Sequence, residues 1–367
     1  MTSHPPRRPA PWQSPGPAAP VPPGARTPVP PPGYGAGGPV RYPGPPGGPV
    51  PYPALPRGPV PFPGRPATTA PLTHAEFYRT PSNRWWKGLL SILGIGAAIA
   101  LFSIVLSFAG VAVDLLLGST TTDELASGRI TLTPALLLAT NLSLIASAAV
   151  AVLLHRYLHR QPVGALHSVA GRFRWGWLGR ASAVVLPLFV AYVAVIVLVE
   201  TPGPIVLDAT TWAFLAIVLL TTPLQAASEE YMFRGVIQRA AGSWVSGTVP
   251  SFVLGTLVSA VLFSLAHFAT DGWLIAYYLV FGIAMSLLTQ LTGGLEAATL
   301  VHAANNVLLF LVSTFTGQMS EGMDRSAGVG GPFMLAPMVV VAGIAAVLIA
   351  LGRSARLQRR AVPPEAG

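Results

Sequence analysis

Eight apolar runs, each of about 20 residues, follow one another between Gly88 and Leu351. A helix needs about 20 apolar residues to cross roughly 30 Å of hydrocarbon, and a lipid-facing run of this length can satisfy its backbone polar groups only as a helix. The runs cover residues 88–113, 134–154, 181–199, 212–228, 250–269, 273–291, 295–315 and 333–351. We therefore expect an all-α, polytopic membrane protein with about eight transmembrane helices, in a membrane domain at residues 84–352.

The composition excludes an ordinary soluble enzyme. Only 10% of the 367 residues are charged and 52% are hydrophobic, whereas a typical soluble protein has about 25% charged residues. Cysteine is absent from the sequence, which excludes disulfide bonds, thiolate metal sites and a cysteine nucleophile. The net charge of +9 suits either nucleic acid or an anionic membrane surface, and the placement of the charges decides between the two.

Basic residues gather before the first run and after the second, fourth and last runs, whereas the other loops are mainly acidic. The basic residues are Arg84 and Lys87, then Arg156, Arg160, Arg172, Arg174 and Arg180, then Arg239, and finally Arg353, Arg356, Arg359 and Arg360. This alternation follows the positive-inside rule for eight spans with both termini in the cytoplasm. We expect a protein of the plasma membrane that contacts membrane lipids and binds no nucleic acid.

The N-terminal part differs in composition from the rest, because 26 of the 38 prolines precede residue 72. Such a segment cannot bury enough apolar surface to offset the entropy of ordering, so residues 1–80 are predicted to form a disordered, Pro/Gly-rich cytoplasmic tail without a secretory signal peptide. A ten-residue repeat at 38–64 spaces aromatic rings regularly, either for a Pro-recognition partner or as a semi-rigid leader. Residues 353–367 are predicted to form a basic cytoplasmic C-terminal tail.

Ionisable side chains are rare near the hydrocarbon, and most of them gather in three short segments of the fourth, fifth and seventh runs. These segments contain Glu229, Glu230 and Arg234, then Phe263 and His267, and then His302 and Asn306. Taken singly, the Glu230 and Arg234 side chains could form an i,i+4 ion pair, and each histidine could hydrogen-bond between helices. Their accumulation on three spans favours a functional site, because an ionisable group at this depth is costly.

The spacing within these segments indicates a hydrolytic site. His302 and Asn306 are four residues apart, so both side chains lie on one face of a helix and can offer two donors to an oxyanion. The carboxylate of Glu229 suits a general base acting on water, and a neighbouring imidazole can orient that water. The sequence contains no HExxH motif and no Ser-Lys dyad, so the nucleophile is expected to be water.

In chain order these residues match the motifs EExxxR, FxxxH and HxxxN. The sequence thereby resembles the CPBP family of intramembrane proteases, which includes CAAX prenyl proteases of the Rce1 type and bacterial Abi immunity proteins. The resemblance covers about residues 180–315, the expected protease core. It implies peptide-bond hydrolysis in the membrane on its cytoplasmic side, and it assigns the roles as follows: Glu229 and His267 activate water, His302 and Asn306 form the oxyanion hole, and Glu230, Arg234 and Phe263 support them.

The resemblance leaves metal dependence open. We expect no required cofactor, although Glu229, His267 and His302 could also ligate zinc and leave one position for water. Two other functions remain as alternatives, a non-catalytic membrane scaffold or immunity protein of the same family, and a transporter. The expected substrate is a membrane-associated peptide or protein, and nothing in the sequence indicates whether it is prenylated.

The depth of two residues conflicts with this mechanism. Counted from Pro250, His267 lies about 25 Å along its helix, whereas Glu229 ends the fourth run at the inner face. The two side chains must come within about 8 Å of each other to share a water. We therefore expect residues 243–256 to lie partly at the interface, or the fifth span to tilt.

Three further polar residues have weaker interpretations. His155 and His159 form an HxxxH pair that could bind a metal, but they are better explained as part of the arginine-rich interfacial belt. Glu296 lies six residues before His302 and so faces another side of the helix, where it could hydrogen-bond to a neighbouring helix.

Overall fold

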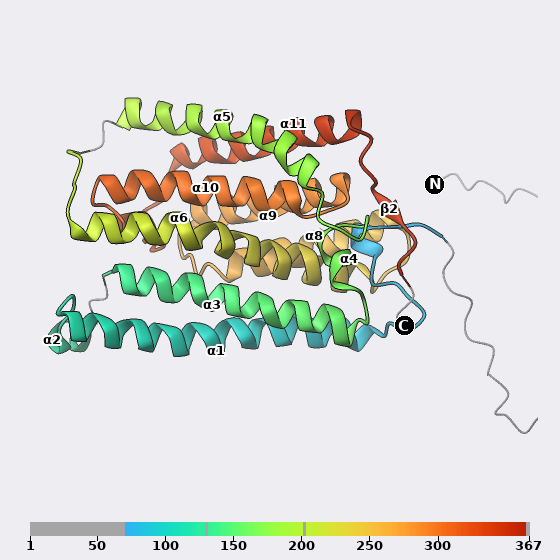
Figure 1. Cartoon of the computed structure of the whole chain (residues 1–367), viewed down its shortest axis with the longest axis horizontal. Coiled ribbons are helices and arrows are strands. Elements are labelled where there is room, and N and C mark those ends of the chain that lie inside the picture. Colours follow the sequence, from blue (N-terminus) through green and yellow to red (C-terminus); the bar gives the residue numbers. More distant parts are fainter. Residues whose placement is uncertain (1–69, 129–130, 201–202, 365–367) are drawn as a thin grey trace, which may run out of the picture. The chain divides into compact units, whose positions relative to one another are not determined.

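Eight helices in the described part of the chain are long and apolar enough to cross a membrane, which confirms the predicted all-α membrane domain. The computed structural model describes residues 70–128, 131–200 and 203–364. Most of the predicted N-terminal tail, including the repeat at 38–64, lies outside these residues. Figure 1 shows the long helices running roughly side by side, with the chain crossing the domain repeatedly.

The long helices coincide closely with the apolar runs. They are α1 (Trp85–Leu117), α3 (Pro134–Leu153), α5 (Trp175–Glu200), α6 (Ala209–Glu230), α8 (Thr248–Leu265), α9 (Gly272–Thr292), α10 (Glu296–Phe315) and α11 (Leu335–Ser354). The short helices are η1 (His74–Glu76), α2 (Thr122–Ala126), η2 (Leu154–Leu158), α4 (Val163–His167), η3 (Tyr231–Ile237), α7 (Gln238–Gly242), η4 (Glu321–Met323) and η5 (Pro332–Met334). The strands β1 (Leu72–Thr73) and β2 (Arg360–Ala361) pair antiparallel.

Local sequence signals set the ends of several spans. The Asp208 side chain accepts a hydrogen bond from the backbone N–H of Thr211 and so caps α6. Asp271 accepts from two backbone N–H groups at the start of α9. Capping residues of this kind satisfy N–H groups that have no partner within the helix. At the other end of α9, Gly293 adopts a left-handed conformation with φ of 76°, which glycine tolerates without steric cost.

The fourth span is longer than predicted. The sequence placed its end at Ser228, where the charged motif begins, but α6 continues without a break through the π-helical η3 and through α7 to Gly242. This expectation was wrong because charge does not end the helix here. Glu229, Glu230 and Arg234 are all buried against neighbouring helices, so they are interior residues of a helical segment and not its solvated end.

Residues 70–80 also differ from the predicted disordered tail. Thr73, His74, Phe77 and Tyr78 are buried, and the side chain of His74 contacts the backbone carbonyl of Arg234, 3.0 Å away. Strand β1 pairs with β2, so part of the predicted C-terminal tail is also held against the domain. Two aromatic residues and several specific hydrogen bonds stabilise this segment, although its proline-rich surroundings resemble a disordered chain.

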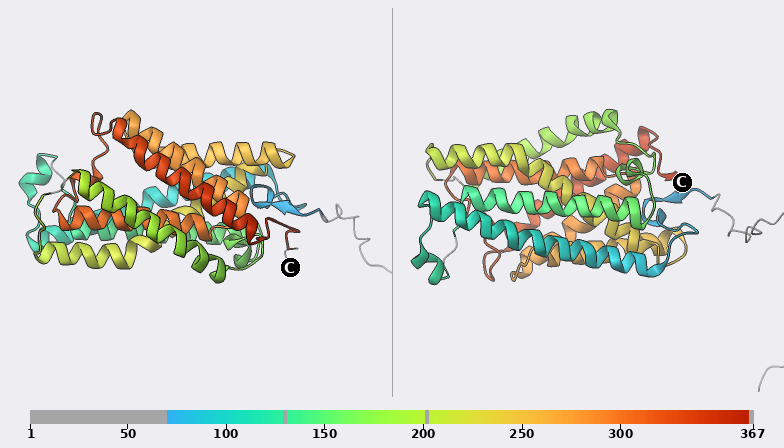
Figure 2. Two further views of the ribbon diagram at one scale, coloured as in Figure 1. Left: turned by 90° about the horizontal axis from the view of Figure 1, so that it is seen from above. Right: turned by 60° about the horizontal axis from the view of Figure 1, so that its bottom comes forward.

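Small residues let the spans approach closely. Helix α1 packs along α3, α3 along α6, α6 along α10, and α8 along α9. The right-hand view of Figure 2 shows α1 and α3 side by side. A Cβ atom at Gly110 would lie 3.2 Å from that of Ala139, and one at Gly282 would lie 3.0 Å from that of Ala260. Such contacts suit helices in lipid, where association depends on packing and hydrogen bonds. Helix α6 is thereby placed between α3 and α10.

Candidate functional site

Two of the three motifs meet where α6 packs against α10. The Nδ1 atom of His302 lies 2.8 Å from Oε1 of Glu230, and the amide of Asn306 donates to Oε1 of Gln225 over 3.4 Å. The contacting residues are four positions apart on α10 and five positions apart on α6. His302 and Asn306 therefore face α6 from the same side of α10. The predicted shared face of the HxxxN motif is therefore directed at the EExxxR motif.

The third motif lies beside the same cluster. The ring of Phe263 lies 4.3 Å below the guanidinium carbon of Arg234, and its centroid is 5.8 Å from that of the His302 ring. The Arg234 guanidinium also donates to the carbonyl of Gly282 on α9, over 3.3 Å. Phe263 thus provides an aromatic surface for a buried cation, an arrangement that is favourable when the cation is desolvated.

The antiparallel register of α8 explains why the predicted conflict in depth does not arise between these motifs. The Ser259 hydroxyl donates to the carbonyl of Phe233 over 2.9 Å, and Gln238 reaches Thr256 over 3.3 Å. Continuing this register brings residues near 263 level with the two glutamates. Because the fourth span extends to Gly242, Glu229 lies inside the domain and not at the end of the helix. The interfacial position of residues 243–256 stays a prediction.

Glu230, Arg234 and His302 form a buried ionic cluster. The guanidinium of Arg234 donates to Oε1 of Glu230 over 2.9 Å, and both side chains are fully buried. The same carboxylate oxygen lies 2.8 Å from Nδ1 of His302 and accepts a hydrogen bond from it. The cluster therefore fixes the ring of His302 and leaves its other nitrogen, Nε2, directed elsewhere.

That nitrogen faces Glu229. His302 Nε2 and Glu229 Oε2 are 3.6 Å apart, longer than a hydrogen bond, while Oε1 of Glu229 accepts from the amide of Gln225. Glu229 is only 6% exposed, and its Oε2 atom has no hydrogen-bond partner among the described residues. A buried carboxylate oxygen with unused acceptor capacity is what a reacting water requires of a general base.

His267 is oriented by its own helix and by aromatic packing. Its Nδ1 atom donates to the carbonyl of Phe263 over 2.8 Å, which leaves Nε2 as the acceptor of a neutral ring. The ring of Tyr278 stacks on it, with centroids 3.9 Å apart. Both His267 and His302 contact Phe263, although the direct pairing of His267 with Glu229 stays a prediction.

Several neutral polar residues extend the cluster and were not singled out from the sequence. Asn305 accepts a hydrogen bond from the hydroxyl of Tyr277 over 3.2 Å and donates to Oδ1 of Asn306 over 3.1 Å. Gln225 joins Asn306 to Glu229. The position of Gln225, four residues before Glu229, is the one signal that could have identified it, since such residues share a helical face.

Among the described residues, the cluster does not have the grouping of side chains that a metal site needs. Within residues 70–128, 131–200 and 203–364, no three His, Asp or Glu side chains are grouped so that they could hold a metal ion. Glu229, His267 and His302 are accordingly not grouped as a metal site in this arrangement.

The three polar residues with weaker interpretations, His155, His159 and Glu296, lie outside the candidate site. His155 and His159 are buried, not part of an exposed interfacial belt, because the N-terminal segment covers them: Nδ1 of His155 is 2.8 Å from the hydroxyl of Tyr78, whose ring stacks on His159. Glu296 accepts two hydrogen bonds from the Arg174 guanidinium, over 2.8 and 2.6 Å. Arg174 is thus the partner of Glu296 that could not be identified from the sequence.

Comparisons with known proteins agree with this site. Residues 210–308, which contain all three motifs, match the family model described as type II CAAX prenyl endopeptidase Rce1-like. The chain is 33% identical over 144 residues to the uncharacterized protein YyaK of Bacillus subtilis (strain 168), an alignment that covers 36% of this chain and 47% of that relative. The chain thus matches about half the length of this curated relative, and no solved structure matches it. Residues 210–308 therefore carry an Rce1-like domain, which confirms the resemblance in the three motifs and suggests intramembrane protease activity in an integral membrane protein.

Proposed function

We propose that this protein is an intramembrane endopeptidase that hydrolyses a peptide bond of a membrane-associated peptide or protein with a water activated by Glu229. One observation carries the proposal, namely that Oε2 of the buried Glu229 has no hydrogen-bond partner among the described residues and faces the fixed His302 ring at 3.6 Å. The match of residues 210–308 to a peptidase family supports the same reaction.

In this mechanism the carboxylate of Glu229 removes a proton from water as the oxygen attacks the scissile carbonyl carbon. The neutral His267 ring orients the water, because its Nε2 atom is free to accept a hydrogen bond while Nδ1 is held by Phe263. As the carbon–nitrogen bond breaks, the proton on Glu229 passes to the leaving amine. General base catalysis of this kind contributes about 10²–10⁴-fold to a rate.

The developing oxyanion is stabilised by donors on α10. In this proposal the His302 ring, held through Nδ1 by Glu230, donates to the oxyanion through Nε2. The amide of Asn306 is the second donor, and its hydrogen bond to Gln225 is long at 3.4 Å, so the substrate can compete for it. Arg234 and Glu230 act by positioning His302.

The orientation in the membrane belongs to the same proposal. The alternation of basic and acidic loops supports cytoplasmic termini and a location in the plasma membrane. With this orientation, the end of the fourth span at Gly242 faces the cytoplasm, and the reaction takes place below that face.

A cleavage screen in membrane fractions tests the proposal. A panel of tagged membrane-associated peptides, with and without a prenyl group, is compared between wild type, Glu229→Ala and His302→Ala, and a chelator is added in parallel. Both variants should lose cleavage, whereas Glu321→Gln, which changes an exposed acid remote from the motifs, should retain it. Because no metal step is proposed, the chelator should leave the rate unchanged.

The same variants separate the proposal from its alternatives. A scaffold or immunity protein would keep its cellular effect in Glu229→Ala, because no reaction would depend on that carboxylate. Proton- or substrate-coupled uptake by reconstituted wild-type protein, without cleavage of any peptide in the panel, would assign a transporter instead. Either result would overturn the peptidase assignment.

A further inference from the structure

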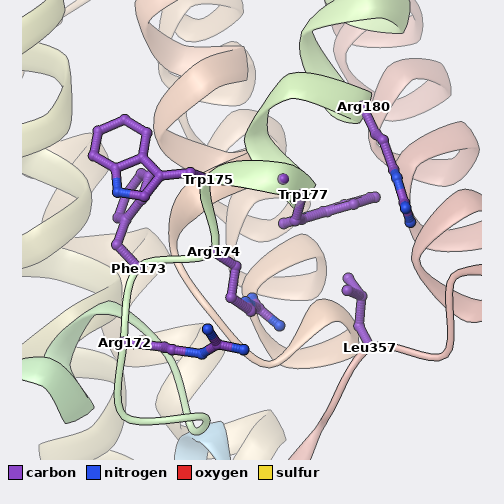
Figure 3. A pocket seen from close by; sticks show the side chains of 8 residues that line it. Arg172, Phe173, Arg174, Trp175, Trp177, Arg180 and Leu357 are labelled. Carbon is purple, nitrogen blue, oxygen red and sulfur yellow. The ribbon is translucent and has the colours of Figure 1, made fainter.

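A pocket lies at the start of α5, apart from the Glu229 and His302 cluster. It has a volume of about 420 Å³, and its lining includes Arg172, Arg174 and Arg180 together with the aromatic residues Phe173, Trp175 and Trp177. Figure 3 shows these side chains gathered around the first turns of α5, with Leu357 of the C-terminal segment on the far side. Two segments distant in sequence thus enclose one basic, aromatic pocket.

Two of the three arginines carry positive charge that no acid neutralises. Arg174 is bound to Glu296 through two of its guanidinium nitrogens and to the carbonyl of Thr292 through the third, so its charge is compensated. Arg172 and Arg180 are exposed, and neither forms an ion pair with any acid in the described parts of the chain. The pocket therefore favours an anion.

The aromatic residues indicate what the anion is attached to. Trp175 is 73% exposed at the first residue of a membrane span and packs against Phe173, with ring centroids 4.5 Å apart. Trp177 is 4% exposed, and its indole N–H has no acceptor among the described residues. Exposed tryptophan beside arginine at the end of a span is typical of the level of lipid headgroups. The ligand thus combines a negative group with an apolar part.

We propose that this pocket binds the phosphate-bearing headgroup of an anionic phospholipid of the cytoplasmic leaflet. Arg172 and Arg180 contact the phosphate, Trp175 lies at the headgroup level, and the acyl chains extend along α5. Phosphate is a suitable anion for arginine, whose guanidinium can donate two parallel hydrogen bonds to it. The site does not depend on the peptidase reaction, so it can be tested without a known substrate.

The pocket is also joined to the helix that carries the candidate oxyanion donors. Its compensated arginine, Arg174, is bound to Glu296, the first residue of α10, and His302 follows on the same helix. A lipid that fastens the start of α5 therefore stabilises the contact between α5 and α10. Binding should raise the unfolding temperature of the protein, because a ligand specific for the folded state stabilises that state.

Native mass spectrometry of the full chain in detergent provides the main test. Wild type is titrated with phosphatidylglycerol or phosphatidylcholine, and the double variant Arg172→Gln/Arg180→Gln is treated identically. Loss of two surface charges should weaken binding of the anionic lipid about 30-fold, while binding of the zwitterionic lipid changes little. The matched control is Arg84→Gln/Arg156→Gln, which removes two other exposed arginines of the same membrane side and should bind like wild type.

Further arms identify the source of the anion. Inorganic phosphate alone, or a short peptide with a free C-terminal carboxylate, should neither displace the lipid nor raise the unfolding temperature. If either ligand matched phosphatidylglycerol, the lipid assignment would be overturned. Equal binding of the anionic lipid by wild type and the Arg172→Gln/Arg180→Gln variant would also overturn it.

A second measurement covers the possibility that the double variant does not fold. A photoreactive analogue of phosphatidylglycerol is added to the wild-type protein, and the labelled peptides are mapped. Labels should concentrate at residues 172–180 and near Leu357, and excess unlabelled phosphatidylglycerol should suppress them. Labels distributed over all lipid-facing helices without this concentration would contradict the proposal.

Discussion

Two fully buried arginines, Arg234 and Arg239, lie five residues apart on the same helical segment and meet opposite environments. Arg234 is paired with the carboxylate of Glu230 at 2.9 Å. Arg239 has no ion pair among the described residues. Its guanidinium donates to the carbonyl of Ala165 over 2.8 Å and to Nδ1 of His74 over 3.1 Å.

The two environments also differ in how fully their polar atoms are used. Around Arg234, Oε2 of Glu229, Oε2 of Glu230 and Nε of Arg234 lack partners among the described residues. Around Arg239, Nη1 donates to Ala165 and Nη2 to His74, Nε lies 3.3 Å from Nε2 of His74, and the rings of Phe77 and Tyr78 lie beside the guanidinium. The Arg234 environment thus keeps a carboxylate oxygen of Glu229 available to a ligand, whereas the contacts of Arg239 hold the N-terminal segment.

The largest expected effect is the loss of catalysis when Glu229, which lies in the environment of Arg234, is replaced. Glu229→Gln keeps the shape and the hydrogen bond to Gln225 but removes the base, so the cleavage rate should fall about 10²–10⁴-fold. The unfolding temperature should stay close to that of wild type. The rate is measured on a peptide identified by the membrane screen. A variant that cleaves at the wild-type rate would contradict the role of Glu229.

Breaking the buried ion pair tests how the charge of Arg234 is balanced. Arg234→Met leaves Glu230 as a buried charge without its cation and should destabilise the protein by about 3–5 kcal/mol. Adding Glu230→Gln should recover part of this loss, because the uncompensated charge disappears. Denaturant unfolding of the single and double variants in detergent measures the coupling. Strictly additive losses would show that the two side chains are not paired.

Loss of His74, the neutral acceptor beside Arg239, should lower the stability of the protein. His74→Ala removes the ring that accepts from Arg239 and should cost about 1–3 kcal/mol of stability. The turnover of folded protein should change little, since His74 contacts only the backbone of Arg234 and none of the side chains of the candidate site. Ser82→Ala, an exposed position in the same segment, is the control for unfolding measurements. If His74→Ala lost turnover but kept its stability, the Arg239 environment would belong to the functional site, and its assignment as a structural contact would be wrong.

The same contact predicts a pH dependence. Burial and, after it, the Arg239 guanidinium hold the pKa of His74 well below its ordinary value of 6.5. The unfolded chain then binds more protons than the folded protein below that value. Stability from this group is fully present above about pH 6.5 and decreases as the pH falls from there toward the folded-state pKa. Unfolding at a series of pH values should show this loss in wild type, and it should be smaller in His74→Ala.

The smallest effect is expected at the two-residue ladder that joins the ends of the domain. Deleting residues 359–367 removes β2 and its pairing with Thr73, which should cost no more than about 1 kcal/mol because a two-stranded ribbon contributes little on its own. Deleting only residues 363–367 leaves the ladder intact and should have no effect. A loss as large as that of His74→Ala would place the anchor at the strands and not at Arg239.

Much of the fold could be predicted because the membrane restricts the choice. Apolar runs of sufficient length can cross only as helices, and all eight runs correspond to helices. The extension of the fourth span to Gly242 was not predicted, because the i,i+4 spacing allowed an ion pair of Glu230 and Arg234 but did not show that neighbouring helices bury it. The N-terminal segment was missed for a related reason. Its contacts, such as the backbone N–H of Ala75 donating to Gln290, join residues far apart in sequence.

The candidate site was predicted where ionisable residues signalled it. Glu230, Arg234, Phe263 and His302 do meet, and Asn306 joins Glu229 through Gln225. Neutral members such as Gln225 and Asn305 gave no signal, because amide side chains are common in membrane helices as interhelical hydrogen-bonding groups. Arg174 and Glu296, 122 residues apart, could be paired only once the helices had been placed in space.

The pairing of β1 with β2 has a consequence for biogenesis. Thr73 lies opposite Arg360, so its partner is made only after nearly the whole membrane domain has left the ribosome. At about 5–20 residues per second, this delay is on the order of 15–60 s. The ladder is therefore among the last contacts of the domain to form, whereas His74 and Arg239 are both present well before Arg360 and can join earlier. The N-terminal segment can thus dock in two steps, first at Arg239 and then at β2.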